Sequence, residues 1–232
     1  MLTLAFDTST SFGSVALFEN QNILFEKSWL REQSHSEMLT SAIDLALRTS
    51  HRQVNDVKRL CVGIGPGSFT GIRVSVNVAR SLAFALDIPV VCLDSFDILV
   101  LGCDPAQTEQ KNLIGMIDAY NNEIFCARFE KINSHWKRDS PSQSKTLAQM
   151  ENEIQTSTLC LGEAYNQYEV YFSTRLQNLV IRDSKFNQFP NVKNLVQSSG
   201  WTDLLTQPLA WNEVQALYIK ASAAEEKLKE TK

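Results

Sequence analysis

The sequence has no excess of basic residues. Its 232 residues carry 22 lysines and arginines against 26 aspartates and glutamates, which gives a formal net charge of −4 at pH 7. Proteins that bind nucleic acid on their own usually present a basic face. This balance therefore argues against a stand-alone nucleic-acid-binding protein. If RNA takes part in the function, we expect tRNA or other RNA to be contacted only indirectly, through another subunit.

The sequence also lacks the common metal-binding spacings. Its three histidines, His35, His51 and His135, form neither an H-x-x-x-H nor an H-E-x-x-H pair, so we predict no metal site. No C-x-x-C pair occurs either, and several cysteines lie in apolar runs, where free cysteine behaves as a small core residue. The five cysteines are Cys61, Cys92, Cys103, Cys126 and Cys160. This usage is typical of a reducing compartment.

Long hydrophobic runs are absent as well. A membrane helix needs about 18 consecutive apolar residues, and the nearest candidate, 82–93, is interrupted by Asp87 and Pro89. Residues 1–7 have no basic stretch ahead of their apolar run, so we expect no signal peptide. With 44% hydrophobic residues, the chain can form one large domain or two of about 100 residues each. We expect a soluble, cytoplasmic protein that does not bind membranes.

Glycine is scarce except in one stretch. Four of the nine glycines, at 63, 65, 67 and 71, fall around residues 65–73, which read GPGSFTGIR. An apolar run at 60–64 precedes this stretch and an apolar-rich segment at 72–86 follows it, which predicts a strand, a tight loop and a helix from 68 to 86 with Ser68 as its N-cap. Three interpretations stay open: the loop binds phosphate at the helix N-terminus, holds the helix against a partner, or only forms a tight turn. It matches neither the Walker A nor the G-x-G-x-x-G spacing.

The helix predicted at 68–86 has apolar residues around most of its circumference. Its polar residues Arg73, Asn77 and Arg80 share one narrow face. Such a helix must be covered on two sides. One side is expected to face its own sheet, and the other either a second helix or a second chain. A further helix is predicted at 34–49, where Ser34 and Glu37 have the spacing of a capping box.

The start of the chain predicts three strands, at 2–6, 14–18 and 23–29, joined as a meander. Asp7, Thr8 and Ser9 follow the first strand. Actin-like and sugar-kinase ATPases place phosphate and metal with this arrangement, although the same residue types are common turn formers. A strand at 89–94 and a helix beginning at Ser95 complete the first half.

The second half repeats this order. The segment 114–130 resembles 4–19, the run 159–162 resembles 61–63, and 179–184 resembles 90–95. The repeat predicts an α/β protein with the duplicated ribonuclease-H-like fold of the actin and sugar-kinase superfamily. We expect two lobes, residues 1–103 and a smaller, reduced lobe at 104–232. We also expect a surface loop at 133–144 and a final helix from 213 to about 229.

Residues 65–73 resemble the GPGSFTGxR signature of the bacterial TsaB (YeaZ) family, which is related to the glycoprotease-like TsaD proteins. Asp118, Ala119 and Glu123 are similar to the family's DARxxEVY segment, with Tyr120 where arginine is usual. Residues 217–220 are similar to its closing P-x-YLR element, with Ala216 at the proline position. The resemblance extends from residue 2 to about 220.

The resemblance implies a non-catalytic subunit of the machinery that makes N6-threonylcarbamoyladenosine in tRNA. It would bind and activate the transferase TsaD together with the ATPase TsaE, or pair with a second copy of itself through the same helices. The residues implied at this interface are Leu39, Ile43, Ser68, Phe69, Ile72, Arg73, Val76, Asn77, Ala79, Arg80 and Ala83. We expect them on an exposed apolar side of the helices.

The resemblance further implies that the chain alone binds no cofactor, and that ATP or ADP binds at a composite site formed with partner subunits. The residues expected near such a nucleotide are Asp7, Thr8, Ser9, Gly65, Gly67, Arg73 and Asp118.

Two other functions stay open. In one, the chain is itself an ATPase or kinase that uses Asp7, Asp94 and Asp118 for metal and phosphates. In the other, it is a peptidase, which would need a nucleophile with a base or a metal-bound water. The three scattered histidines offer neither arrangement.

Overall fold

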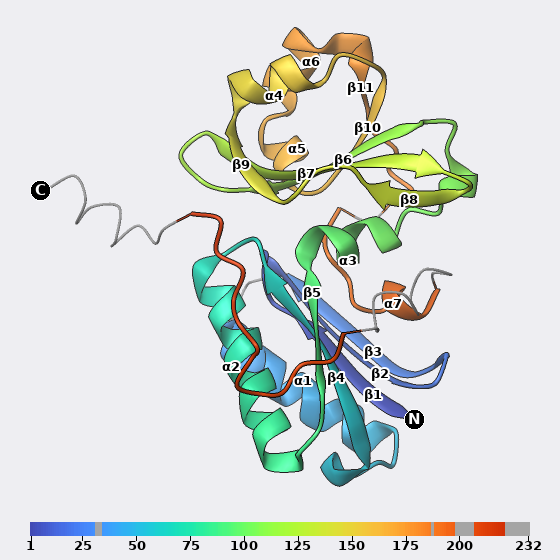
Figure 1. The fold of residues 1–232 in the computed structure, drawn as a ribbon, viewed down its shortest axis with the longest axis vertical. Coiled ribbons are helices and arrows are strands. Elements are labelled where there is room, and N and C mark those ends of the chain that lie inside the picture. The colour runs from blue at the N-terminus through green and yellow to red at the C-terminus, as the bar shows by residue number, and fades with distance from the viewer. Residues whose placement is uncertain (31–33, 187, 198–206, 221–232) are drawn as a thin grey trace, which may run out of the picture.

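The computed structural model describes residues 1–30, 34–186, 188–197 and 207–220. It contains two lobes, each built on one mixed sheet (Figure 1). None of the helices in these ranges is long and apolar enough to cross a membrane.

The first lobe is a five-stranded sheet with the order β3-β2-β1-β4-β5. Strands β1 and β2, and β2 and β3, pair antiparallel, whereas β4 and β5 add in parallel. The strands are β1 (Leu2–Asp7), β2 (Phe12–Glu19), β3 (Asn22–Leu30), β4 (Val57–Gly65) and β5 (Val90–Asp94). Its helices are α1 (His35–Thr49), α2 (Phe69–Leu86) and α3 (Ser95–Leu101), with a short 3₁₀ turn η1 (Val54–Asp56). The predicted meander and both predicted helices are confirmed.

Residue pattern explains these elements. β1 is buried at every position and contains β-compatible apolar residues, whereas β3 alternates between exposed and half-buried positions, as a strand at the edge of a sheet does. In α1 the buried residues recur at helical spacing, from Leu39 through Ala42 and Ile43 to Ala46. Ser68 caps α2 as predicted, because its hydroxyl accepts a hydrogen bond from the amide of Gly71.

The second lobe repeats the first. Its sheet has the order β11-β10-β6-β7-β8, and β9 also pairs with β7. Read from β8, the order is third, second, first, fourth and fifth strand, as in the first lobe, and the parallel and antiparallel pairings match. The strands are β6 (Asn112–Asp118), β7 (Glu123–Ile132), β8 (His135–Arg138), β9 (Gln143–Thr146), β10 (Thr158–Leu161) and β11 (Val180–Ile181). The duplicated ribonuclease-H-like fold is therefore the observed fold.

The helices of the second lobe are shorter than those of the first. They are α4 (Leu147–Glu153), α5 (Ala164–Gln167) and α6 (Glu169–Arg175), with 3₁₀ turns η2 (Pro105–Gln107) and η3 (Gln177–Leu179). They cover a core that contains Met116, Phe172 and Leu176. The prediction of a reduced second lobe agrees with this shortening.

The C-terminal segment 207–220 returns to the first lobe and runs along α2 (Figure 1). Leu209 and Val90 exchange backbone hydrogen bonds of 2.8 and 3.0 Å, and the amide of Leu217 donates to the carbonyl of Ile64 at 2.9 Å. Val214 is fully buried in the core of the first lobe. The predicted division at residue 104 therefore differs from the structure, because this segment packs on the first lobe.

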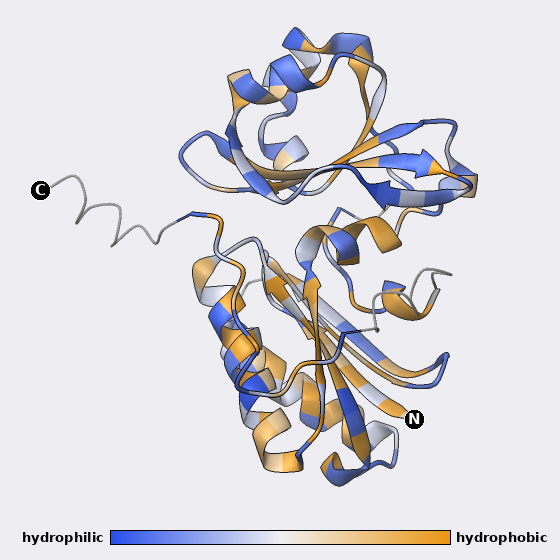
Figure 2. Cartoon of the chain, in the orientation of Figure 1, coloured by the Kyte–Doolittle hydropathy of each residue, from blue (hydrophilic) through white to orange (hydrophobic). Residues whose placement is uncertain are grey.

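A second returning piece, α7 (Asn194–Gln197), also belongs with the first lobe. It contacts α3, and Val192 and Leu195 pack with Phe18 beneath the first sheet. Both helices contain apolar stretches (Figure 2).

Three local predictions were wrong. Ser34 makes no side-chain cap with α1; its hydroxyl lies 2.7 Å from that of Ser36 instead. The predicted loop at 133–144 contains β8, which extends the sheet as an edge strand beside β7. The predicted final helix is absent from 213–220, where the chain follows an irregular path and the amide of Leu217 bonds to β4. Its remainder lies outside the described residues.

Candidate functional site

The turn after β1 carries the acidic residue expected at a phosphate site. Asp7 is fully buried, and its Oδ1 accepts hydrogen bonds from the amide of Ser9 at 3.2 Å and from its hydroxyl at 2.9 Å. Its Oδ2 is buried and has no hydrogen-bond partner among the described residues. Burial raises the pKa of Asp7 to about 7, against the lowering effect of the Ser9 hydrogen bonds.

The GPGSFTG loop closes directly over this turn. The amide of Ser68 donates to the carbonyl of Ser9 at 2.6 Å, and the hydroxyl of Thr8 donates to the carbonyl of Gly71 at 2.8 Å. A β-carbon at position 67 would lie 2.0 Å from the Ser9 carbonyl oxygen, and one at position 71 would lie 1.9 Å from that of Thr8. These two glycines are thus required by the close approach of one backbone to another.

His35 fixes the same turn from α1. The indole nitrogen of Trp29 donates to its Nδ1 at 3.2 Å, and its Nε2 lies 2.9 Å from the carbonyl oxygen of Thr10. Since Nδ1 accepts a hydrogen bond and the carbonyl can only accept one, Nε2 carries the proton and the ring is neutral. His35 therefore positions the turn.

This packing closes part of the predicted nucleotide site in the chain alone, and the composite site with partner subunits stays a prediction. Asp7, Thr8 and Ser9 are all 0% exposed, so none of them reaches a ligand in this conformation. Gly65 is also buried, and the Ile72 side chain and the carbonyl oxygen of Leu217 lie on the side where a β-carbon would point.

The remaining predicted nucleotide residues are separated from one another. Gly67 packs against the carbonyl group of Ser9. Arg73 lies on the exposed face of α2, where its guanidinium stacks 4.0 Å above the ring of Phe69. Only Asp118, of the predicted set, lines the cavity between the lobes.

That cavity, of about 340 Å³, lies where the loops after β1, β4, β6 and β10 meet. Most of its residues are polar or acidic, and the described residues that line it include neither lysine nor arginine: Thr10, Ser11, Ser68, Ile117, Asp118, Tyr120, Glu163, Asn166 and Gln167. A phosphate group would meet two carboxylates here without a protein cation, which disfavours it.

Glu163 is a residue of this cavity that the sequence reasoning missed. Its carboxylate accepts a 2.5 Å hydrogen bond from Ser11, so it joins the second lobe to the first. Burial raises the pKa of Glu163, and the charge of Asp118 adds to the rise. Its place after Gly162, the counterpart of Gly63 in the sequence repeat, was the signal available.

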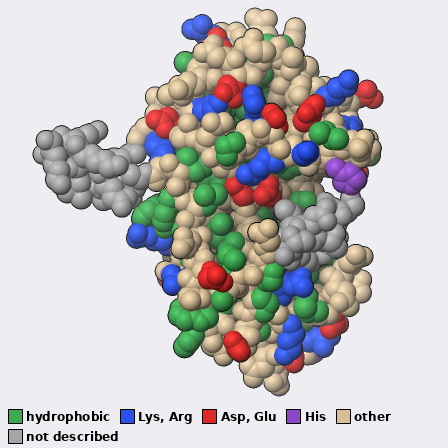
Figure 3. Space-filling view, viewed as in Figure 1, with side chains coloured by type: hydrophobic (Ala, Val, Ile, Leu, Met, Phe, Trp, Pro, Cys, Tyr) green, Lys and Arg blue, Asp and Glu red, His purple; other side chains and the backbone are tan. Residues whose placement is uncertain are grey.

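The face over α2 is the second candidate site. A groove of about 580 Å³ runs between α2 and the C-terminal segment. Its lining combines two arginines with amide and apolar groups: Arg73, Val76, Asn77, Arg80, Val214, Gln215, Ala216 and Tyr218. Apolar and basic side chains lie next to one another on this face (Figure 3).

The expected interface residues divide into two groups. Arg73, Asn77 and Arg80 are exposed, and Ser68 and Phe69 are half-buried. The prediction of exposure was wrong for the apolar members, which belong to the core of the first lobe. These are Leu39, Ile43, Ile72, Val76, Ala79 and Ala83, each no more than 7% exposed.

The second side of α2 is covered within the chain. The apolar stripe of α2 faces the sheet, while α1 and the C-terminal segment flank the helix. Within the described residues, the chain itself therefore covers part of the second side of α2, and pairing of α2 with a second chain stays a prediction. Three aromatic residues that sequence reasoning missed remain exposed beside the groove: Phe84 at 66%, Trp211 at 39% and Tyr218 at 42%.

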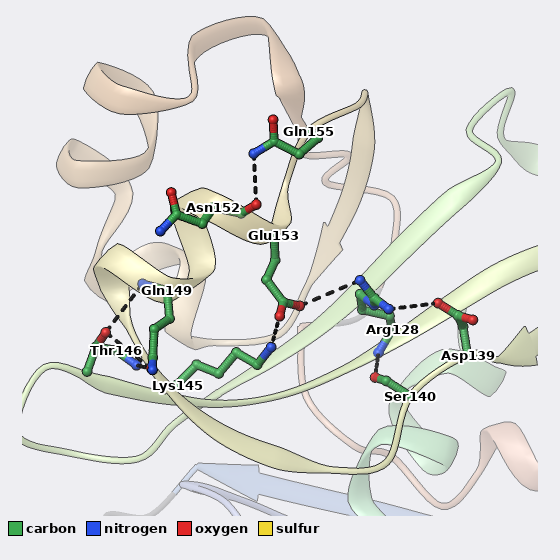
Figure 4. A network of polar contacts seen from close by, with 9 residues as sticks. All are labelled: Arg128, Asp139, Ser140, Lys145, Thr146, Gln149, Asn152, Glu153 and Gln155. Atoms are coloured by element: carbon green, nitrogen blue, oxygen red, sulfur yellow. Dashed lines mark hydrogen bonds and ion pairs between the residues drawn. The ribbon is translucent and has the colours of Figure 1, made fainter.

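A third cavity, of about 310 Å³, lies in the second lobe beside a chain of charged groups (Figure 4). Arg128 pairs with Asp139 at 3.1 Å and with Glu153 at 3.7 Å, and Glu153 also pairs with Lys145. Each of these charged groups has an oppositely charged partner, as in an ion-pair network with a structural role. Within the described ranges, no group of three or more histidine, cysteine or acidic residues is placed to hold a metal ion.

Comparison with known proteins agrees with this description. A family model described as TsaD, tRNA N6-adenosine threonylcarbamoyltransferase, matches residues 30–228. A Haemophilus influenzae protein named tRNA threonylcarbamoyladenosine biosynthesis protein TsaB is 27% identical, over 97% of this chain and 96% of its own length. The Escherichia coli protein of that name is 29% identical over 56% of each chain, so the match covers about half of it.

Solved structures show the same fold. A Pseudomonas aeruginosa protein described as similar to peptidase YeaZ has a TM-score of 0.76 and 21% identity, and the match covers 94% of this chain and 99% of that one. A structure described as YeaZ from the same organism has a TM-score of 0.73 and 20% identity, with the same coverage.

Proposed function

Because the chain belongs to the TsaB (YeaZ) family, within the wider TsaD-type family, we propose that it is a non-catalytic subunit of the bacterial machinery that makes N6-threonylcarbamoyladenosine in tRNA. In this proposal the chain binds TsaD, the threonylcarbamoyltransferase, and holds it in an active arrangement together with the ATPase TsaE. The near-complete match to a relative named for this biosynthesis supports the assignment.

One observation carries the non-catalytic part of the proposal. The turn that would hold phosphate in an ATPase of this superfold is sealed, because the GPGSFTG loop buries Asp7, Thr8 and Ser9 completely. The open cavity nearby is lined by Asp118 and Glu163 and, among the residues that the structure describes, by no basic residue. Phosphoryl transfer needs cations around the transferring group, which this cavity does not supply from its own side chains.

The exposed face over α2 is the proposed docking surface. It carries Arg73, Asn77 and Arg80 with the exposed ring of Phe84. TsaD and a second copy of this chain would compete for it, since one surface accommodates one partner at a time. ATP or ADP would enter only at a composite site completed by the partner subunits.

The test uses the purified chain and TsaD from the same organism. Light-scattering chromatography of the chain alone and of the mixture measures whether a heterodimer replaces self-pairing. A tRNA modification assay with TsaD and TsaE, with and without the chain, then measures whether modification depends on it. A stoichiometric complex and dependence on the chain support the proposal. No complex, together with metal-dependent ATP turnover by the chain alone, would assign it to the ATPase alternative.

A further inference from the structure

The end of the C-terminal segment passes from one lobe to the other. Val214 packs in the core of the first lobe, and the amide of Leu217 donates to the carbonyl of Ile64 in β4. Ile219 packs instead against the apolar core of the second lobe. Figure 1 shows the segment running along α2 and reaching the second lobe. Residues 217–220, the strap, therefore contact both lobes.

An ion pair fastens the end of the strap to the second lobe. The Lys220 ammonium lies 3.0 Å from the Glu123 carboxylate at the start of β7, and the two side chains are only 20% and 32% exposed. The Ser144 hydroxyl donates to the same carboxylate at 2.7 Å. The bond from Ser144 and the pair with Lys220 both lower the pKa of Glu123, because they stabilise its charged form. Glu123 is therefore ionised at neutral pH and holds the lysine.

The strap also contacts the GPGSFTG loop of the first lobe. The ring of Tyr218 packs 4.7 Å from that of Phe69 in this loop. The neighbouring residue Ser68 lines the cavity between the lobes. The turn that ends at Glu123 lines the same cavity from the second lobe, through Asp118. The strap therefore connects two walls of one cavity, one wall in each lobe.

Arg138 and the chain itself join the lobes on the side of α3. Arg138 of β8 pairs at 3.0 Å with Asp94, the residue before α3, and the chain crosses between the lobes at 102–111, directly after this helix. Arg138 lies opposite Phe129 on β7. Phe129 is six residues from Glu123, which is about 20 Å at 3.3 Å per residue. The strap is thus far from the α3 side, where a small rotation of one lobe against the other produces a large displacement.

From this arrangement we infer that the strap sets the width of the cavity between the lobes, and that release of Lys220 from Glu123 lets the second lobe rotate away from the GPGSFTG loop about the α3 side. The hydrogen bond from Ser11 to Glu163 joins the lobes at the cavity and breaks in this rotation. The loop also loses the contact with the ring of Tyr218. This conformational device lies within the chain, so the inference does not depend on the proposed function.

The experiment compares Glu123→Lys, which repels Lys220, with the charge-swapped double variant Glu123→Lys/Lys220→Glu. Arg52→Gln is the control, because its ion pair lies within the first lobe. Mass spectrometry of the full chain measures two rates: amide hydrogen exchange in the segment 66–72, and carbodiimide labelling of the Glu163 carboxyl group. We expect Glu123→Lys to raise both rates at least fivefold. The double variant and Arg52→Gln should each stay within twofold of the original chain.

Three results would overturn the inference. One is a Glu123→Lys chain in which both rates stay within twofold of the original. Another is faster exchange confined to the turn 118–123, which would mean that the ion pair stabilises this turn alone. The third is a double variant that reacts as fast as Glu123→Lys.

Exchange in the buried strand β1 reports whether a variant has unfolded as a whole. If it rises in Glu123→Lys, the milder Lys220→Gln takes its place, because it removes one charge without creating repulsion. Lys220→Gln should then raise both rates at least threefold with β1 protected. Rates within twofold of the original in this variant would contradict the role of the strap.

Discussion

Asp7 and Gly63 lie so close that a β-carbon on residue 63 would stand 1.7 Å from the Oδ2 atom of Asp7. The two residues are on adjacent parallel strands, β1 and β4. The buried carboxyl group thus occupies the space that a side chain at 63 would fill. The turn after β1 is therefore buried by β4 itself and by the loop that follows β4.

Gly63→Ala is predicted to destabilise the fold strongly. The methyl group must displace a fully buried carboxyl, and overpacking of a core costs about 1–3 kcal/mol or more. Urea unfolding at pH 7 measures the loss. Gly102→Ala is the control, since Gly102 has φ −78 at the end of α3 and should change stability by less than about 1 kcal/mol. Equal unfolding midpoints for Gly63→Ala and the original chain would contradict the packing of Asp7 against β4.

Asp7 should make stability depend on pH near neutrality. Its pKa rises from 3.8 to about 7 on folding, so the folded state binds more protons than the unfolded state between these values. The contribution is fully present below about pH 4 and is lost as pH rises through about 7. Asp7→Asn removes the titration, so the decline in unfolding free energy between pH 5 and 8 should shrink, by an amount on the order of 3 kcal/mol.

Asp97 provides the reference for that measurement. Burial raises its pKa to about 6, with Arg138 opposing the rise and Asp94 adding to it. Part of the pH dependence should therefore survive in the Asp7→Asn chain at the acidic end of the range. A pH profile identical in the two chains would mean that Asp7 is ionised in the folded state.

Arg138 is predicted to hold the two lobes together. It reaches from β8 to Asp94 at 3.0 Å and to Asp97 at 3.1 Å in the first lobe, and it lies over the ring of Phe129 at 5.3 Å. Arg138→Gln leaves two half-buried carboxylates without their cation, which should cost about 2–4 kcal/mol. Thermal unfolding checks this against Arg48→Gln, whose exposed pair with Asp44 should contribute less than about 1 kcal/mol. Equal losses in the two variants would contradict the role of Arg138.

The C-terminal segment is predicted to be part of the first lobe's core. Val214 is fully buried there, so Val214→Ala should lower the unfolding free energy by about 1–3 kcal/mol. Val170→Ala is the matched control, because Val170 is 80% exposed and should change stability by less than about 0.5 kcal/mol. A Val214→Ala chain as stable as this control would show that the segment does not pack on α2 in solution.

The fold was largely predictable from the sequence. Asp7 and Asp118 each end the first strand of a meander, one in each lobe. This repeat in the sequence predicted the two-lobed topology. The resemblance carried by residues 65–73 is confirmed by relatives named TsaB over most of the chain. Local patterns of this kind report on elements that are contiguous in sequence.

The surface of α2 was not predictable in the same way. Periodicity showed that Ile72, Val76 and Ala83 must be covered, but it cannot tell a second chain from a distant part of the same chain. The cover is partly residues 207–220, which are about 140 residues away and have no regular pattern of their own. The burial of Asp7 could not be predicted for a similar reason, because it depends on the close approach of the backbone at Gly67 and Gly71 to the turn after β1.

The buried Asp7 turn is predicted to take no part in catalysis. The test is the rate of tRNA threonylcarbamoylation by TsaD and TsaE in the presence of the original chain or of Asp7→Asn, with complex formation checked for both. We predict equal rates, and no ATP turnover by either chain alone. A large loss of rate with the Asp7→Asn complex intact, accompanied by ATP turnover in the original chain that the variant lacks, would contradict the account and return Asp7 to the chemistry.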